Sequence, residues 1–165
     1  MSIIQKIVPC LWFDGQAEDA AKFYVSIFDR SRITRVSHYG EEGQEITGQK
    51  PGSVMTVAFE LERVSFTALN GGPQYKFNEA ISLQVLCKTQ DEIDRLWGKL
   101  SAGGDPKAQQ CGWLRDKFGL CWQIVPEQMA DWMTDGDPTK AARVMKALLN
   151  MKKLEIATLE QAHAG

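Results

Sequence analysis

The predicted elements follow the same order in the two halves of the chain, and this repetition most restricts its fold. In the first half, a strand pattern over 3–14 precedes an amphipathic helix over 16–28 and a strand over 33–39. A solvated loop is expected over 40–52, and two further strands, over 54–61 and 64–69, form a hairpin around Glu62-Arg63. The second half has a strand over 81–87, a helix over 89–100 with Thr89 as its expected N-cap, and two strands within 111–126. The order repeats although the sequences hardly match, so we interpret the halves as two copies of one structural module.

The segment after the second module is predicted to be helical. Asp137-Pro138 has the form of a helix start, with a capping aspartate before a proline in the first turn. The chain has 165 residues, which fits one domain. We therefore predict a single domain over 1–165. Its modules span about 3–73 and 79–126, its helical extension spans 127–162, and residues 162–165 fray.

Composition excludes several classes of partner. The chain carries 19 basic and 21 acidic side chains, a net charge of −2, which gives no electrostatic footprint for nucleic acid or an anionic membrane. It has no apolar run of membrane-span length and no signal-peptide pattern at its start, so we expect a cytoplasmic protein. None of its four cysteines forms a C-x-x-C pair, so we expect reduced thiols rather than a zinc ribbon or redox centre.

Five segments together resemble one protein family. They are LWFDGQAEDAAKFYVSIF at 11–28, FTALNGGPQYKFNEAISLQV at 66–85, DEIDRLWGKLSAGG at 91–104, CGWLRDKFGLCWQIVP at 111–126 and VMKALLNMKKLEIATLE at 144–160. The chain is similar to the vicinal oxygen chelate superfamily of glyoxalases and bleomycin-resistance proteins. Within it, the chain resembles the PhnB-like branch, labelled 3-demethylubiquinone-9 3-methyltransferase domain. The resemblance implies an α+β fold of paired βαβββ modules, each curling its sheet around a ligand cavity, and usually a homodimer.

Many members of that superfamily hold a divalent metal ion with His, Glu or Asp side chains, and the metal acts as a Lewis acid. Aligned by the resemblance, the ligand positions fall on Pro9, on Gln123, on Ser82 or Gln84, and among 66–68. None of these is a good ligand, because proline has no side-chain donor and a neutral amide replaces a carboxylate poorly. The sequence therefore predicts that the metal site is absent, and we expect no cofactor.

The two histidines are not expected to be metal ligands. His38 lies at the end of a predicted strand, where a partly exposed structural residue is the more common role. His163 lies in the tail that is expected to fray, so we predict that it faces solvent.

Gln84 and Gln123 are polar residues at equivalent places in otherwise apolar strands. A buried amide must find hydrogen-bond partners, and two interpretations stay open. The amides bond each other or the backbone, or they bind a polar group of a ligand. Ser82 shares the strand face of Gln84 by the two-residue alternation and joins them as a candidate.

Aromatic candidates for a pocket wall are Trp12, Trp113 and Phe77. Tryptophans on such strands are more often core residues, but Trp113 follows Gly112, where another group can approach closely. Phe77, in the loop between the modules, would act as part of a lid.

Two polar candidates complete the predicted ligand site. Asn70 lies where the first module opens, so it either forms a turn or hydrogen-bonds a substrate. Cys111 is the thiol most suited to face a pocket, although a structural role is favoured.

Four functions remain from these observations. The first is a metal-independent protein that binds an unidentified small molecule, as a binding module or an enzyme of unassigned reaction. The alternative is a metal-dependent lyase, isomerase or dioxygenase of the glyoxalase type. A methyltransferase is less favoured, because Gly71-Gly72 is followed by Pro73 and not by a helix that would hold the cofactor. The fourth is a dimeric scaffold whose pocket is filled by side chains.

Overall fold

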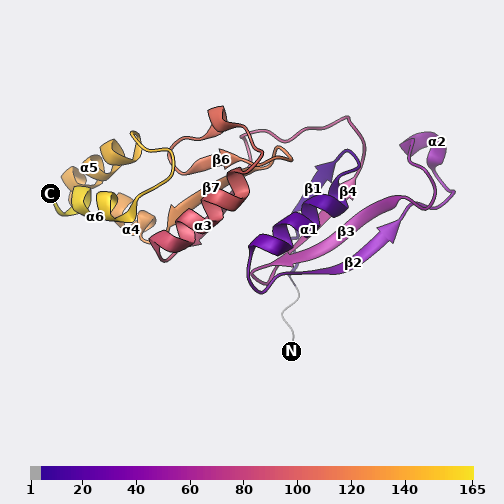
Figure 1. Cartoon of the computed structure of the whole chain (residues 1–165), viewed down its shortest axis with the longest axis horizontal. Coiled ribbons are helices and arrows are strands. Elements are labelled where there is room, and N and C mark those ends of the chain that lie inside the picture. The colour runs from indigo at the N-terminus through magenta and orange to yellow at the C-terminus, as the bar shows by residue number, and fades with distance from the viewer. Residues whose placement is uncertain (1–4) are drawn as a thin grey trace. The chain divides into compact units, whose positions relative to one another are not determined.

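The computed structural model describes residues 5–165 and divides into two compact units between Phe77 and Asn78 (Figure 1). Over the described residues the chain forms seven strands and six α-helices, so the mixed α+β class is confirmed. The predicted first strand began at residue 3, and residues 3 and 4 lie outside the described part. No helix between residues 5 and 165 is long and apolar enough to cross a membrane.

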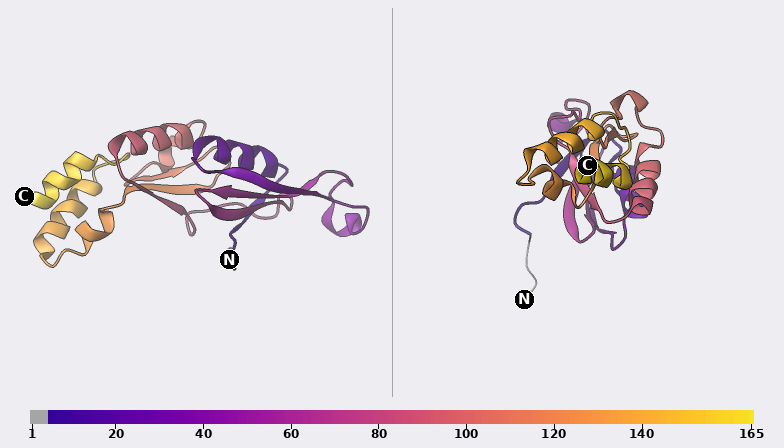
Figure 2. Two further views of the ribbon diagram at one scale, coloured as in Figure 1. Left: turned by 90° about the horizontal axis from the view of Figure 1, so that it is seen from below. Right: turned by 90° about the vertical axis from the view of Figure 1, so that its left-hand side faces the viewer.

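The first unit is a four-stranded sheet with a helix on one face. Its strands are β1 (Cys10–Phe13), β2 (Arg32–His38), β3 (Val54–Leu61) and β4 (Val64–Asn70). The strand order is β1-β4-β3-β2, with β1 parallel to β4 and the other pairs antiparallel. Helix α1 (Ala17–Ile27) buries an apolar stripe that includes Ala20 and Tyr24, and it packs on β3 and β4 (Figure 2). The Phe59 and Phe66 rings stack in this core, with centroids 5.4 Å apart.

The connections of the first unit depend on unusual backbone angles. Glu62 and Arg63 join β3 to β4, as predicted, and both have positive φ, 46° and 69°. These signs are those of a type I′ turn, which suits hairpin twist but favours glycine or asparagine. The exposed segment 40–52 was predicted to be a loop, but it contains a single helical turn, α2 (Gln44–Thr47). A glycine in the left-handed conformation lies at each end of α2, and the second of them stops the helix.

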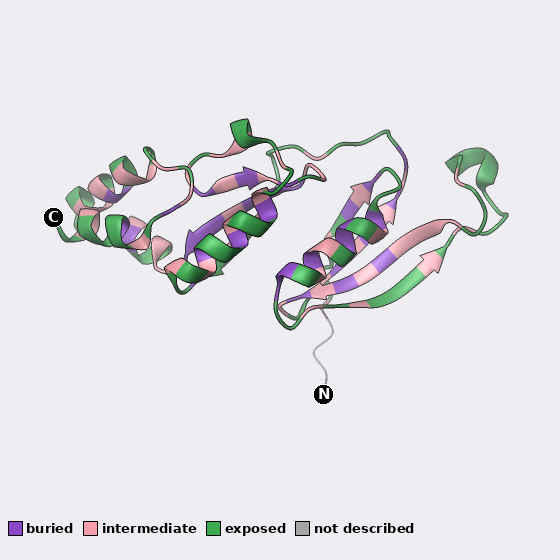
Figure 3. Cartoon of the chain, in the orientation of Figure 1, coloured by how far each residue is buried: buried purple, intermediate pink, exposed green. Residues whose placement is uncertain are grey.

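The second unit has a smaller, three-stranded sheet. Its strands are β5 (Leu83–Cys87), β6 (Trp113–Arg115) and β7 (Cys121–Pro126). In the order β5-β7-β6, β5 is parallel to β7, and β7 is antiparallel to β6. Helix α3 (Gln90–Ser101) packs on this sheet through a buried stripe that includes Leu96, and its outer side is exposed (Figure 3). Thr89 caps α3 as predicted, because its hydroxyl accepts a hydrogen bond from the Glu92 amide at 3.3 Å.

The second sheet is one strand shorter than the repeated module implies. Where the first unit has β2, the second has only a short 3₁₀ helix, η1 (Pro106–Ala108), and an isolated bridge between Gln110 and Trp113. Pro106 lacks an amide proton for strand pairing. Gly104 lies so close to β6 that a Cβ there would be 2.1 Å from the Arg115 carbonyl oxygen. The chain therefore passes against β6 without forming a strand.

Three helices close the second unit: α4 (Met129–Met133), α5 (Pro138–Leu148) and α6 (Ile156–Ala164). They share a core of Val125, Trp132, Val144, Leu154 and Leu159. Asp137 caps α5 as predicted, with its carboxylate accepting from the Thr139 amide at 2.8 Å.

The predicted fraying of the C-terminus was wrong. Helix α6 continues to Ala164, and His163 Nε2 lies 2.9 Å from Asp135 Oδ2. The His163 side chain is only 24% exposed, so it does not project freely into solvent. The contact joins the end of α6 to the loop before α5, which is a long-range pairing that local sequence patterns do not reveal.

Candidate functional site

Polar side chains lie in a line across the second sheet. In the strand register, Gln84 of β5 pairs with Gln123 of β7, and Gln123 pairs with Trp113 of β6. Their neighbours Leu114 and Trp122 are buried on the face that packs against α3. By the alternation of strands, the two amides and Trp113 therefore share the opposite face. We call it the amide face and define it by Ser82, Gln84, Trp113 and Gln123.

Hydrogen bonds link three members of the amide face. Gln123 Nε2 donates to Ser82 Oγ at 2.8 Å, and Gln84 Nε2 donates to Gln123 Oε1 at 3.4 Å. The second bond is long for an N–H···O contact. The amides thus do bond each other, as one of the two interpretations expected. Gln84 is nevertheless exposed and Gln123 half-buried, so their polar groups remain within reach of a ligand.

Cys111 takes a structural position next to the amide face. Its φ is 53°, and its amide donates to the Met151 carbonyl at 2.8 Å. Gly112 continues this pairing by donating to the Lys152 carbonyl at 2.7 Å. A Cβ on Gly112 would be 3.0 Å from both the Ile124 carbonyl and the Leu154 side chain, so glycine is needed where the chain passes under the C-terminal segment. The thiol accepts only a weak contact from Gln110 Nε2, at 3.5 Å.

Two aromatic candidates belong to the first unit and contact other rings there. Trp12 Nε1 donates to the Gly72 carbonyl at 2.8 Å, and its ring meets Tyr75 edge-on at 4.9 Å between centroids. A Cβ on Gly71 would lie 2.2 Å from the Trp12 ring, which explains the glycine at that position. Phe77 packs edge-on against Phe13, with centroids 5.2 Å apart.

Asn70 is buried and fixes the start of α1 on the sheet. Its Oδ1 accepts from the Ala17 amide at 2.9 Å, and its Nδ2 donates to the Val54 carbonyl at 3.0 Å. Its own carbonyl accepts from the Tyr39 hydroxyl at 2.6 Å. Both side-chain polar atoms therefore already bond the backbone, and the first of these bonds satisfies an amide of the first helical turn.

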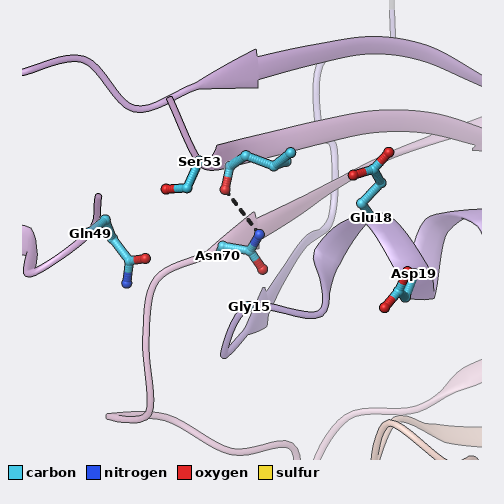
Figure 4. Close-up of a pocket in the computed structure, with 7 residues that line it drawn as sticks. Gly15, Glu18, Asp19, Gln49, Ser53 and Asn70 are labelled. Carbon is cyan, nitrogen blue, oxygen red and sulfur yellow. Dashed lines mark hydrogen bonds between the residues drawn. The ribbon is translucent and has the colours of Figure 1, made fainter. Parts of the chain in front are cut away.

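Asn70 also lines a cleft of about 250 Å³ in the first unit (Figure 4). The lining is Gly15, Glu18, Asp19, Gln49, Ser53, Val54 and Asn70. Two carboxylates and several neutral groups give the cleft an acidic character that suits a neutral or cationic ligand. Glu18 is already paired with Lys22 at 2.8 Å, and this hydrogen bond lowers its pKa. The sequence did not point to this cleft, because Glu18 and Asp19 fit the ordinary acidic first turn of a helix.

The positions that correspond to metal ligands do not fit a divalent cation. The side chains of Phe66 and Ala68 are buried, so only Thr67 of that segment can reach the face away from α1. Thr67 pairs with Cys10, a surface thiol whose pKa is raised by partial desolvation, and a raised pKa disfavours the metal-binding thiolate. His38 is exposed at the end of β2. Within residues 5–165, no three His, Cys, Asp or Glu side chains gather in a way that could hold a metal ion.

Comparisons with known proteins place the chain among related folds. The family model described as 3-demethylubiquinone-9 3-methyltransferase matches residues 5–125. A putative 3-demethylubiquinone-9 3-methyltransferase, PhnB protein, from Bacillus cereus is 36% identical, with a TM-score of 0.62 over 73% of this chain and 99% of that chain. Protein PA1353 from Pseudomonas aeruginosa is 19% identical, with a TM-score of 0.57 over 74% of this chain and 98% of that one.

A third solved structure extends the likeness of fold. The fosfomycin resistance protein FosX from Mesorhizobium loti is 13% identical, with a TM-score of 0.51 over 74% of this chain and 91% of that chain. At such identities the second and third structures show the fold alone. No curated protein matches this chain.

Proposed function

The chain belongs to the family described as 3-demethylubiquinone-9 3-methyltransferase, the PhnB-like branch of the vicinal oxygen chelate superfamily, and from this premise we propose that it binds a small molecule on its amide face without a metal ion. Whether the bound molecule is also converted depends on groups that the amide face does not include. Amides and a hydroxyl bind and orient polar groups, but they neither hold nor transfer protons readily near neutral pH.

One observation supports this proposal most strongly: the register that puts Gln84, Gln123 and Trp113 side by side on one face. An amide offers donors and acceptors at once, so two adjacent amides recognise a polar group that has both. The indole ring beside them offers a flat apolar surface. A few convergent polar groups next to an aromatic wall are the usual composition of a small-molecule site.

The proposal is tested by titrating uniformly ¹⁵N-labelled protein with a panel of small polar aromatic compounds. We expect binding compounds to shift the backbone amides of β5 and β7 and the Trp113 indole. Gln123→Leu should raise the dissociation constants of these compounds about tenfold or more, since it removes a hydrogen-bonding partner from a half-buried site. The control is Gln161→Leu, which alters an exposed amide on α6. Unchanged affinity in Gln123→Leu contradicts the proposed site.

The absence of a metal requires its own measurement. Purified protein should contain less than one equivalent of nickel, zinc, iron or manganese by elemental analysis. A stoichiometric transition metal that survives dialysis would favour the glyoxalase-type lyase, isomerase or dioxygenase instead.

The family description names a methyltransferase, and the local geometry does not favour that activity. Gly71 and Gly72 follow β4, but the next helix of the described chain begins only at Gln90. A glycine-rich turn that binds a nucleotide cofactor leads from a strand directly into a helix. Tight binding of S-adenosylmethionine in a calorimetric titration would show that the cofactor is held elsewhere and would contradict the proposal.

A further inference from the structure

A guanidinium group borders the amide face. Arg115 follows Trp113 by two residues on β6, and Leu114 between them is buried on the α3 side. Strand alternation therefore directs Arg115 to the same face as Trp113 and Gln123. Its side chain is 31% exposed, so the group is anchored along the sheet and still accessible.

The hydrogen-bonding capacity of Arg115 is only partly used. Its Nη2 pairs with Glu79, while its Nε is buried and finds no acceptor among the described residues. A guanidinium has five N–H donors, and a carboxylate fits two of them at once. The single contact with Glu79 therefore leaves the fork of this arginine incompletely satisfied.

Glu79 is held near Arg115 only loosely. It is 63% exposed and lies in a turn where the Asn78 side chain accepts from the Ala80 amide at 2.9 Å. Ion pairs at such exposure contribute little to stability, so a ligand can displace Glu79 easily. Asp116, the next residue along the chain, does not compete for Arg115. It is buried, and its carboxylate accepts from the amides of Phe118 and Leu120 and from Trp122 Nε1.

We propose that Arg115 is the anion-recognition residue of the amide face and that the ligand is a small organic carboxylate with a flat apolar body. The carboxylate takes the place of Glu79 on Nη2 of Arg115, the nitrogen that already meets an anionic group. The flat body lies against Trp113, and Gln84 and Gln123 bond further polar groups of the ligand. This assignment rests on the proposed binding function and adds the chemical class of the ligand.

The test uses matched pairs of probes: benzoate with benzamide, and phenylacetate with phenylacetamide. Each amide keeps the shape of its acid but removes the negative charge. Dissociation constants are measured by NMR from the shifts of the Arg115 Nε–Hε and Trp113 indole signals. We expect each carboxylate to bind at least about tenfold more tightly than its amide, because hydrogen bonds to charged groups are the stronger ones.

Three variants test the role of Arg115. Arg115→Gln should remove the preference for the carboxylates, and Arg115→Lys should restore only part of it, since lysine keeps the charge but not the fork. Glu79→Gln should tighten carboxylate binding about threefold or more, because it removes the competing anion. This variant leaves the buried part of Arg115 in place, so it tests the proposal even if Arg115→Gln is unstable. The control is Lys99→Gln, which removes a cation from the exposed side of α3.

The outcomes separate this inference from the proposed function. Two results would overturn the role of Arg115: equal affinity of the amide face for acids and amides, or equal losses of carboxylate affinity in Arg115→Gln and Lys99→Gln. Either result would still be consistent with a site for neutral ligands. No binding of any of the four probes at the amide face would overturn both. Tighter carboxylate binding in Glu79→Gln, together with loss of the preference for carboxylates in Arg115→Gln, supports the assignment.

Discussion

The last strand of each unit carries an amide side chain, and the two amides have different surroundings. Asn70 ends β4 in the first unit, where its side chain is buried and bonds the backbone at two points. Gln123 lies in β7 of the second unit, where it bonds only the side chains of Ser82 and Gln84. Backbone partners fix an amide in place, whereas side-chain partners can move. The same strand arrangement thus gives one amide a structural role and leaves the other suited to a ligand.

The largest contrast between the units concerns the cysteines of their first strands. Cys87 ends β5 and is fully buried, and desolvation raises its pKa to about 12, whereas Cys10 begins β1 and is exposed. The thiolate is the reactive form, so at pH 8 Cys87 should react with iodoacetamide roughly a thousandfold more slowly than an unperturbed thiol. Cys10 should react much faster than Cys87.

Peptide mapping by mass spectrometry over time measures both rates, and the same reaction in 8 M urea is the control, since unfolding removes the burial of Cys87. Similar reaction rates for the two thiols in the native protein would show that the second unit unfolds locally and exposes Cys87 to the reagent. The burial of Cys87 would then not distinguish the two units.

The second contrast is between the two amides themselves. Asn70→Leu should lower the free energy of unfolding by about 2–4 kcal/mol, because it removes the acceptor of the buried Ala17 amide and the donor to the part-buried Val54 carbonyl. Gln123→Leu should change it by less than about 1 kcal/mol, because the residue is half-buried and its partners can bond water. Urea denaturation of both variants gives the comparison. Equal losses in the free energy of unfolding would show that Gln123 stabilises the fold as much as Asn70 does.

Features set by neighbouring residues could be predicted from the sequence. Thr89 and Asp137 were recognised as helix caps, and both side chains accept the expected amide hydrogen bonds. The hairpin at Glu62-Arg63 was also found, because the apolar alternation changes on either side of it.

Features set by distant residues could be predicted only in part. The bond between Gln84 and Gln123 was one of two interpretations, but the place of Trp113 beside them depends on the register between β6 and β7, which no local pattern fixes. Arg115 shares the face of Trp113, a placement that follows from the two-residue alternation of β6. The cleft of the first unit requires Gln49 and Ser53 to lie beside Glu18, some thirty residues earlier in the chain.

A third, smaller contrast lies in the hairpin turns. The turn of the second unit has a glycine at positive φ, Gly119 at 91°, whereas the first unit has Arg63 at 69°. A residue with a Cβ is strained in this conformation, so Arg63→Gly should stabilise the protein by about 0.5–1 kcal/mol despite the greater freedom of glycine when unfolded. A thermal melt monitored by circular dichroism measures this gain. Gly119→Ala is the reciprocal variant and should lower the melting temperature. A lower melting temperature in Arg63→Gly would mean that the Arg63 side chain contributes more than its strain costs.

The smallest expected effect concerns the C-terminal helices, which have no counterpart in the first unit. The backbone amide of Asp137 and the side chain of His163 both hydrogen-bond Asp135 and lower its pKa in the folded protein. Because the folded pKa lies below the unfolded value, this contribution is complete above the unfolded pKa and is lost as the pH falls through the folded one.

Asp135→Asn should therefore destabilise the protein slightly at pH 7, and the difference from the wild type should shrink as the pH falls below about 4. Urea denaturation between pH 7 and pH 3 measures this, with Asp131→Asn, an exposed carboxylate on α4, as the control. A difference that stays constant across this range would mean that the Asp135 contacts act through geometry and not through charge.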